Sequence, residues 1–200
     1  IDAALEAAQV ARLAAVLVAH AHYDHAMDCA EVAIRTGALL VGSESVANIG
    51  RGAGIPENRL HVVGGGDTCP FDRFNVTIYR TIHSPDPKFC GEIDEPLSQP
   101  ARVRDYRERG CLPFLVEHDG HKVLIHPSAN MLSGMYVGVS TDVVFLAIGM
   151  LTKEGHAFFE RYWREVVVET GARLVIPVHW DDFRISLDEP LQPMPSLIAD

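Results

Sequence analysis

The chain lacks a long apolar run. Nowhere in its 200 residues is there the stretch of roughly 18 to 20 apolar residues that a membrane-spanning helix needs. The N-terminus also lacks the basic, apolar and small-residue pattern of a signal peptide. We therefore expect no membrane span. Because the chain opens on Ile1 rather than Met, the localisation stays unknown.

Basic residues are scarce. The chain has 17 Lys and Arg against 27 Asp and Glu, which gives a formal net charge of −10. Proteins that bind the phosphate backbone of nucleic acids need clustered Lys and Arg. We therefore expect no nucleic-acid partner.

Cysteine is also infrequent, and its spacing is uninformative. The four residues Cys29, Cys69, Cys90 and Cys111 form no CxxC pair or zinc-ribbon pattern, so the spacing predicts no thiolate metal site. Ordinary thiols are the expected state. The alternative is a disulfide between Cys90 and Cys111, which the even count permits.

The hydropathy pattern predicts one α/β domain over residues 1–200. A content of 48% hydrophobic and 22% charged residues suits a single buried core. Helical and apolar segments alternate from the start of the chain, which is typical of α/β layering. The expected helices are 2–14, 28–36 (closed by Gly37), 43–48 and 154–170, and the expected strands are 16–19, 38–41, 60–63, 75–82, 112–117, 122–126, 143–148 and 174–178.

Residues 84–110 show no sustained period and are rich in Pro and charged side chains. We interpret them as a long loop, a lid or insert with a short helix around 102–109. Since this segment directly follows a candidate ligand, His83, we expect it to form a wall of a substrate pocket.

The chain has ten histidines, and three of them stand in the six residues HAHYDH that follow the apolar run Ala15 to Ala19. Side chains two apart on an extended segment point the same way, so His20 and His22 can bind one ion together. Asp24 and His25 are free to face a second position. A surface cluster or a set of core histidines explains poorly why four metal-ligand side chains occur in six residues.

Two further histidines, His83 and His179, each close a separate predicted strand. They are the obvious distant ligands. Neutral imidazole is a good zinc donor, and three protein ligands with one open position lower the pKa of bound water toward neutrality. The pattern therefore predicts hydrolytic metal chemistry.

HAHYDH has the HxHxDH form of the metallo-β-lactamase superfamily. The chain resembles this superfamily in three further segments, in the same order: TIHSP with His83, KVLIHPSAN, and VIPVHWDDF with His179. The resemblance implies an αββα sandwich with a metal site at one edge of its two sheets. It also implies two ligand sets: His20, His22 and His83 for a first metal, and Asp24, His25 and His179 for a second.

One position departs from the family pattern. Many members have a bridging Asp where this chain has Ser128, and serine supplies no bridging carboxylate. We therefore expect one tightly bound Zn²⁺ and a second that is weak or absent. His126 is either a substitute ligand or a group that supports the site from behind, and Asp181 either orients an imidazole or is an exposed loop acid.

The resemblance implies a zinc-dependent hydrolase that uses a metal-bound hydroxide on a small ester, lactone or amide substrate, closer to lactonases and esterases than to true β-lactamases. Asp24 is the expected catalytic residue, as a ligand or as the group that orients the water and takes its proton. The alternatives are a non-catalytic, degenerate metal-binding member and an iron-dependent oxidoreductase of the same fold.

A second departure is that only nineteen residues precede His20, where family members usually have several strands. We expect a first sheet with shortened N-terminal strands. Its exposed edge would favour a homo-oligomer.

Overall fold

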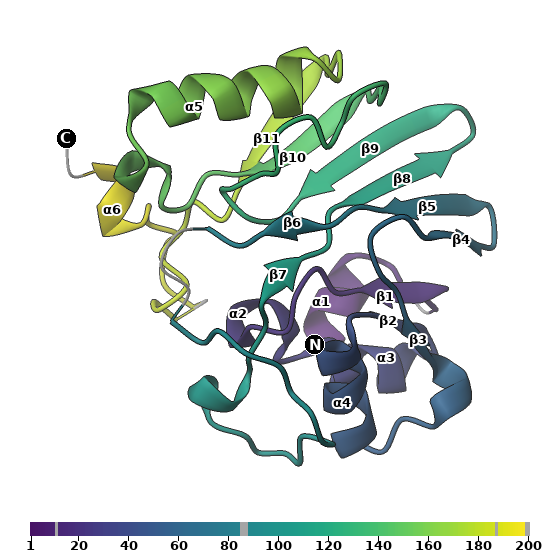
Figure 1. The fold of residues 1–200 in the computed structure, drawn as a ribbon. Coiled ribbons are helices and arrows are strands. Elements are labelled where there is room, and N and C mark those ends of the chain that lie inside the picture. The colour runs from purple at the N-terminus through teal and green to yellow at the C-terminus, as the bar shows by residue number, and fades with distance from the viewer. Residues whose placement is uncertain (11, 85–87, 187, 199–200) are drawn as a thin grey trace. The chain divides into compact units, whose positions relative to one another are not determined.

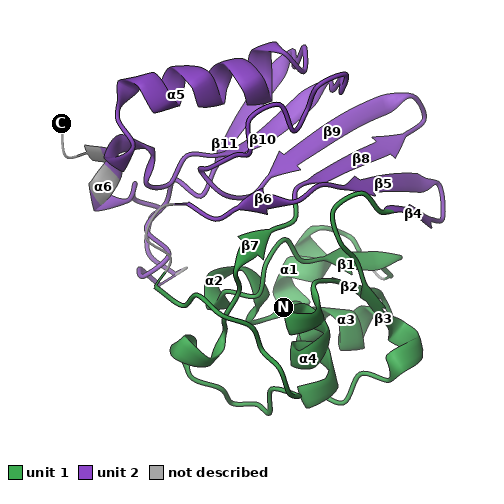
Figure 2. Cartoon of the chain, viewed as in Figure 1, with its two compact units in different colours: residues 1–67, 88–112 green, residues 68–87, 113–200 purple. Residues whose placement is uncertain are grey.

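The computed structural model describes residues 1–10, 12–84, 88–186 and 188–198. The chain divides into two compact units, residues 1–67 with 88–112 and residues 68–87 with 113–200 (Figure 2). The single domain over residues 1–200 stays a prediction.

The first unit contains a three-stranded parallel sheet in the order β1-β2-β3 (Figure 1). Its strands are β1 (Ala15–Leu17), β2 (Leu39–Gly42) and β3 (Leu60–Val62), close to the predicted positions. The connections carry the helices α2 (Tyr23–Ala26), α3 (Cys29–Thr36) and α4 (Glu44–Gly52) and the 3₁₀ turn η1 (Glu57–Arg59). A helical crossover is what joins parallel neighbours, so the predicted alternation is confirmed here.

Local signals set the ends of two of these helices. Gly37 follows α3 with φ 74°, a left-handed conformation that costs glycine little. Ser43 precedes α4, and its Oγ accepts a hydrogen bond from the Val46 N–H at 3.3 Å. Both residues act as the sequence predicts.

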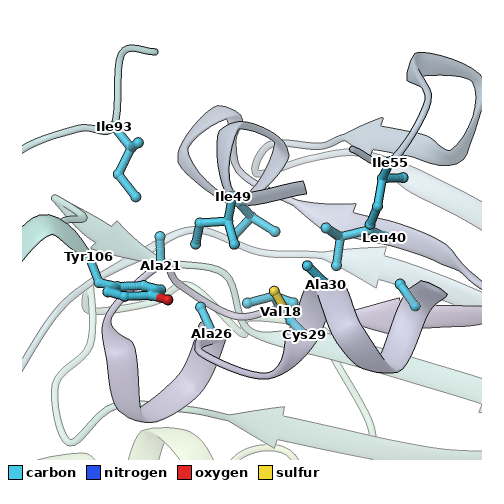
Figure 3. Close-up of a cluster of buried hydrophobic side chains, with 12 residues drawn as sticks. Val18, Ala21, Ala26, Cys29, Ala30, Leu40, Ile49, Ile55, Ile93 and Tyr106 are labelled. Carbon is cyan, nitrogen blue, oxygen red and sulfur yellow. The ribbon is translucent and has the colours of Figure 1, made fainter. Parts of the chain in front are cut away.

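The core of the first unit draws on β2, α3, α4 and a later segment of the chain. Leu40 and Ile49 are buried in one hydrophobic cluster, and Ile93 and Tyr106 belong to the same cluster (Figure 3). Residues 88–112 are therefore part of this unit.

Helix α1 (Asp2–Ala7) is much shorter than the predicted helix 2–14, and that prediction is wrong. Gln9 adopts φ 56°, Val10 N donates to Leu5 O and Gln9 N donates to Glu6 O, which together form a Schellman termination. None of the helical residues is buried. Without a face to pack, helical propensity alone does not extend so short a helix.

The 88–112 segment is fastened to α4. Asn48 Nδ2 donates to Ile93 O at 2.6 Å, and Leu97 N donates to Asn48 O at 2.9 Å. A Cβ at Gly52 would lie 1.9 Å from the Leu97 carbonyl oxygen, so only glycine allows this approach. The predicted helix at 102–109 is instead the 3₁₀ turn η2 (Val103–Asp105), followed by β7 (Gly110–Cys111), and residues 85–87 of the predicted lid lie outside the described residues.

All four cysteines are thiols, so the disulfide alternative for Cys90 and Cys111 is wrong. Burial raises the pKa of the Cys29 thiol to about 12.

The second unit contains a mixed six-stranded sheet in the order β11-β10-β9-β8-β5-β4. Its strands are β4 (Thr68–Phe71), β5 (Phe74–Ile78), β8 (Phe114–His118), β9 (His121–His126), β10 (Val143–Ala147) and β11 (Leu174–Val178). The last three are parallel to one another. The predicted hairpin is confirmed, with Asp119 (φ 48°) and Gly120 (φ 80°) in its turn.

Two strand assignments differ from the prediction. The predicted strand 75–82 is divided into β5 and β6 (Thr81–Ile82). β4 was not predicted. It contains Pro70, which lacks a backbone donor, and the sheet accepts this residue because β4 is an edge strand.

The predicted helix 154–170 is α5 (His156–Trp163), which continues into a π-helical turn at Arg164–Val168. Tyr162 and Val166 from this helix pack with Leu124, Val144 and Leu146 of the sheet in the core of the second unit. The unit also contains η3 (Leu151–Lys153) and α6 (Pro195–Ile198).

Candidate metal centre

The HxHxDH segment begins at the carboxyl end of β1. Val18 N donates to Val41 O at 2.9 Å, and Leu112 N donates to Ala19 O at 2.8 Å. Backbone hydrogen bonds therefore fix the chain up to Ala19, the residue before His20. His22 then takes an extended conformation (φ −69°, ψ 150°) as the N-cap of α2. The chain therefore turns at the residues that could bind a metal. These residues lie at the carboxyl edge of the sheet, which is where α/β proteins bind ligands.

Four of the predicted ligands lie together in the first unit. The ring centroids of His20 and His22 are 4.9 Å apart and those of His20 and His25 are 3.9 Å apart. Asp24 Oδ2 lies 3.4 Å from His25 Nε2. Three imidazoles and a carboxylate in one place are a donor set that suits Zn²⁺ or iron.

One contact indicates the tautomer of His22. Its Nε2 lies 3.1 Å from the Phe89 carbonyl oxygen. A carbonyl only accepts, so Nε2 carries the hydrogen and donates, and the lone pair is on Nδ1. Histidines that bind a metal usually donate their other ring N–H to a carbonyl or carboxylate in this way.

In the second unit, His83 follows β6 and its turn is tied to the segment after β9. Asn130 Nδ2 donates to His83 O at 2.9 Å, and Ser84 N donates to Ser128 Oγ at 2.7 Å. His83 Nδ1 lies 3.1 Å from both the carbonyl oxygen and the hydroxyl oxygen of Ser84. Donation to the carbonyl oxygen would leave the lone pair on Nε2. Sequence reasoning missed Asn130, although it stands in the quoted segment KVLIHPSAN.

Ser128 and His126 both act behind the His83 turn in this structure. Ser128 is buried and uses its hydroxyl as the acceptor just described. His126 is fully buried, its Nε2 donates to Asn130 O at 2.8 Å, and its Nδ1 accepts from the Tyr136 hydroxyl at 2.7 Å. Burial lowers the pKa of His126 to about 4, so the ring is neutral. With both nitrogens engaged, these contacts favour the supporting role over that of a substitute ligand.

His179 follows β11 with φ 57°, an uncommon backbone conformation for a residue other than glycine. A Cβ added to Gly149 would lie 2.7 Å from both His179 Nδ1 and its carbonyl oxygen, so the two residues are closely apposed. Residues with such backbones often lie at functional sites. Asp181 lies two residues farther on, in an isolated bridge with Pro193.

A second residue that the sequence did not suggest lies in the first unit. Glu108 is a buried carboxylate whose Oε2 accepts from the Ser43 hydroxyl, and burial raises its pKa. No local pattern marks it, because its partners lie far away in the sequence.

None of the described helices has the length and apolar character of a membrane span.

No protein-family model matches the chain. Two curated relatives are UPF0173 metal-dependent hydrolases. One, from Methanosphaera stadtmanae, is 25% identical over 170 residues, which are 84% of this chain and 66% of the relative. The other, from Exiguobacterium sp., is 27% identical over 173 residues, which are 84% of this chain and 68% of the relative.

Among solved structures, the fold is similar to that of Igni18, a metallo hydrolase from Ignicoccus hospitalis, with a TM-score of 0.57 and 18% identity over 86% of this chain and 66% of that one. It is also similar to YhfI, a metallo-β-lactamase fold protein from Bacillus subtilis, with a TM-score of 0.51 and 15% identity over 84% of this chain and 64% of that one. The chain has the metallo-β-lactamase fold and is similar in sequence to UPF0173 metal-dependent hydrolases. The predicted α/β fold class is confirmed.

The fold is also similar to that of a protein described as a hydroxylase. CmlA, a diiron β-hydroxylase from Streptomyces venezuelae, has a TM-score of 0.51 and 16% identity over 84% of this chain and 36% of that one. The chain spans about two thirds of the length of the curated relatives it matches.

Proposed function

We propose that the protein is a metal-dependent hydrolase. The observation that carries the proposal is the local gathering of His20, His22, Asp24 and His25 at the end of β1, with His22 oriented by the Phe89 carbonyl. The names of the curated relatives support hydrolysis.

We propose the two ligand sets that the resemblance in sequence implies. His20, His22 and His83 would hold one ion, and Asp24, His25 and His179 a second. Zn²⁺ is the metal we propose, because imidazole and carboxylate donors suit it and because hydrolysis needs no redox chemistry. When bound, the metal would polarise the attacked group and lower the pKa of a water molecule.

The chain's own residues supply orientation and proton transfer. The hydrogen bond from His22 Nε2 to Phe89 O fixes the His22 ring and its tautomer. Asp24, whose Oδ2 lies 3.4 Å from His25 Nε2, has two alternative roles in this proposal: it is a ligand of the second ion, or it accepts the proton of the attacking water. An ester, lactone or amide of a small molecule is the proposed substrate class. The homo-oligomer through a sheet edge remains a prediction.

An iron-dependent oxidoreductase is the second candidate, because the same fold occurs in the diiron hydroxylase CmlA and the same donors bind iron. A non-catalytic metal-binding protein is the third.

Metal content of protein prepared without chelators, together with hydrolysis of a panel of lactones, esters, thioesters, amides and β-lactams, tests the proposal. We expect zinc and hydrolysis of at least one panel member, both lost in His22→Ala. The matched control is His156→Ala, because His156 is an exposed histidine on α5. Iron with no hydrolysis would favour the oxidoreductase. Metal that His22→Ala releases, with no reaction of either kind, would favour the non-catalytic protein.

A further inference from the structure

Glu108 is a buried acid that no Lys or Arg side chain neutralises in the described part of the chain. Its Oε2 accepts from the Ser43 hydroxyl, and its Oε1 accepts from Arg109 N at 3.2 Å. The backbone of Ala21 also lowers the pKa of this carboxyl, against the larger effect of burial. Only 9% of the residue is exposed. A buried carboxylate is costly unless donors or a cation compensate it.

The Ala21 contact places this carboxylate on the peptide between His20 and His22. Ala21 is fully buried, and both neighbouring imidazoles project from the same short segment. A group that acts on the Ala21 backbone therefore acts on the segment that carries both candidate ligands. The positive charge that a cation brings there would face the negative charge of Glu108.

The same segment makes two further contacts with the HxHxDH motif. The Phe89 carbonyl accepts from His22 Nε2 at 3.1 Å and from Glu108 N at 3.3 Å, so one oxygen joins His22 to Glu108. Leu112 N donates to Ala19 O at 2.8 Å. Residues 89–112 thus hold the motif at Ala19 and His22, on either side of Ala21.

Ser43 adds a rigid support. Its Oγ caps α4 by accepting from Val46 N, and its hydroxyl hydrogen goes to Glu108. The carboxylate is thereby fixed to the N-terminus of a helix whose next two turns are buried. A network of fully satisfied donors on a packed helix is a means of holding ligands in place.

We propose that Glu108 is a positioning residue for the metal ligands His20 and His22. It fixes the Ala21 peptide, and its negative charge strengthens the binding of a cation at these histidines. This inference rests on the proposed metal centre. Supporting groups of this kind typically change metal affinity by about 10- to 100-fold.

The test compares Zn²⁺ affinity, from competition with a chromophoric chelator, in wild type, Glu108→Gln and Glu108→Asp, with the visible spectrum of the Co²⁺-loaded forms. Gln keeps the size and loses the charge and one acceptor. We expect about a 10- to 100-fold weaker affinity and an altered Co²⁺ spectrum in Glu108→Gln. Glu108→Asp, which keeps the charge, should lose less affinity.

Thermal unfolding of the metal-free forms separates positioning from simple stabilisation. If the variants unfold at lower temperature but keep wild-type Zn²⁺ affinity and Co²⁺ spectrum, the inference is overturned. If Glu108→Gln does not fold, Glu108→Asp decides, because a shorter carboxylate that leaves the affinity unchanged contradicts positioning. His22→Ala distinguishes the two proposals. If the wild type binds no Zn²⁺, or if His22→Ala binds Zn²⁺ as tightly as the wild type, the proposed metal centre is overturned and this inference with it.

Discussion

The side chain of Asn130 donates a hydrogen bond from Nδ2 to the carbonyl oxygen of His83 across 2.9 Å. Its Oδ1 accepts from Met131 N at 2.9 Å. One amide group therefore joins the turn after β6 to the turn after β9. The position of a candidate metal ligand depends on a residue 47 positions away in the sequence.

Asn130→Asp should separate these two contacts. The carboxylate still accepts from Met131 N but cannot donate to the His83 carbonyl, so we expect a loss of about 1 to 3 kcal/mol in unfolding free energy and weaker Zn²⁺ binding. Denaturant unfolding and chelator competition measure the two effects. Asn58→Asp, at an exposed position in η1, is the control for the added charge. Equal behaviour of the two variants would contradict the prediction.

Ser128→Asp should raise the metal content. A carboxylate at this position keeps an acceptor for Ser84 N and adds the negative charge that the proposed second metal lacks. We expect one tightly held Zn²⁺ per chain in the wild type and two in the variant, by elemental analysis of protein prepared without chelators. Ser128→Ala, which removes the acceptor, should not gain a metal. Two tightly held ions in the wild type would show that the bridge is unnecessary.

His126 should make the stability of the metal-free protein dependent on pH. Its pKa falls from 6.5 to about 4 on folding because the ring is fully buried. Between these values the unfolded chain binds more protons than the folded chain. The free energy of unfolding is therefore at its full value above pH 6.5 and decreases as the pH falls toward 4. The shift corresponds to about 3 kcal/mol. Denaturant unfolding of the wild type and His126→Gln in the presence of a chelator measures it, and the difference between them should shrink at low pH.

Gly149→Ala should disturb His179. The added methyl group would lie 2.7 Å from His179 Nδ1 and from its carbonyl oxygen, so His179 has to move. We expect a loss of about 1 to 3 kcal/mol in stability and weaker binding at the proposed second metal position. Gly64→Ala is the control, because its Cβ would meet only Asp67 Oδ2, at 4.0 Å. If both variants bind metal as the wild type does, His179 is not a ligand.

Local signals predicted much of the fold. Gly37, Ser43 and Asp119-Gly120 act at short range, and each ends, begins or turns an element where the sequence indicates. The prediction of a helix over 2–14 was wrong because none of the residues of α1 is buried, so no packing extends the helix. The prediction of one strand over 75–82 was wrong because the alternation of β-branched and polar residues continues past the point where the chain leaves the six-stranded sheet.

The candidate site divides in the same way. HAHYDH is contiguous, so its ligand-type residues were visible in the sequence. Glu108 and Asn130 were not, because each is defined by a partner far along the chain and neither belongs to a periodic pattern. Glu108 lies in a loop rich in charged residues, and the sequence alone does not distinguish this buried acid from the exposed acids near it. Only its contacts in the folded chain do so.

The interleaved course of the chain constrains the order of synthesis and folding. Residues 1–67 leave the ribosome first, but the core they form is completed only by Ile93 and Tyr106. A nascent chain that ends at residue 67 also lacks the Phe89 carbonyl and the Glu108 carboxylate, which hold His22 and Ala21. The HxHxDH segment is therefore made long before the groups that fix it are available, and no single cut divides the protein into its two units.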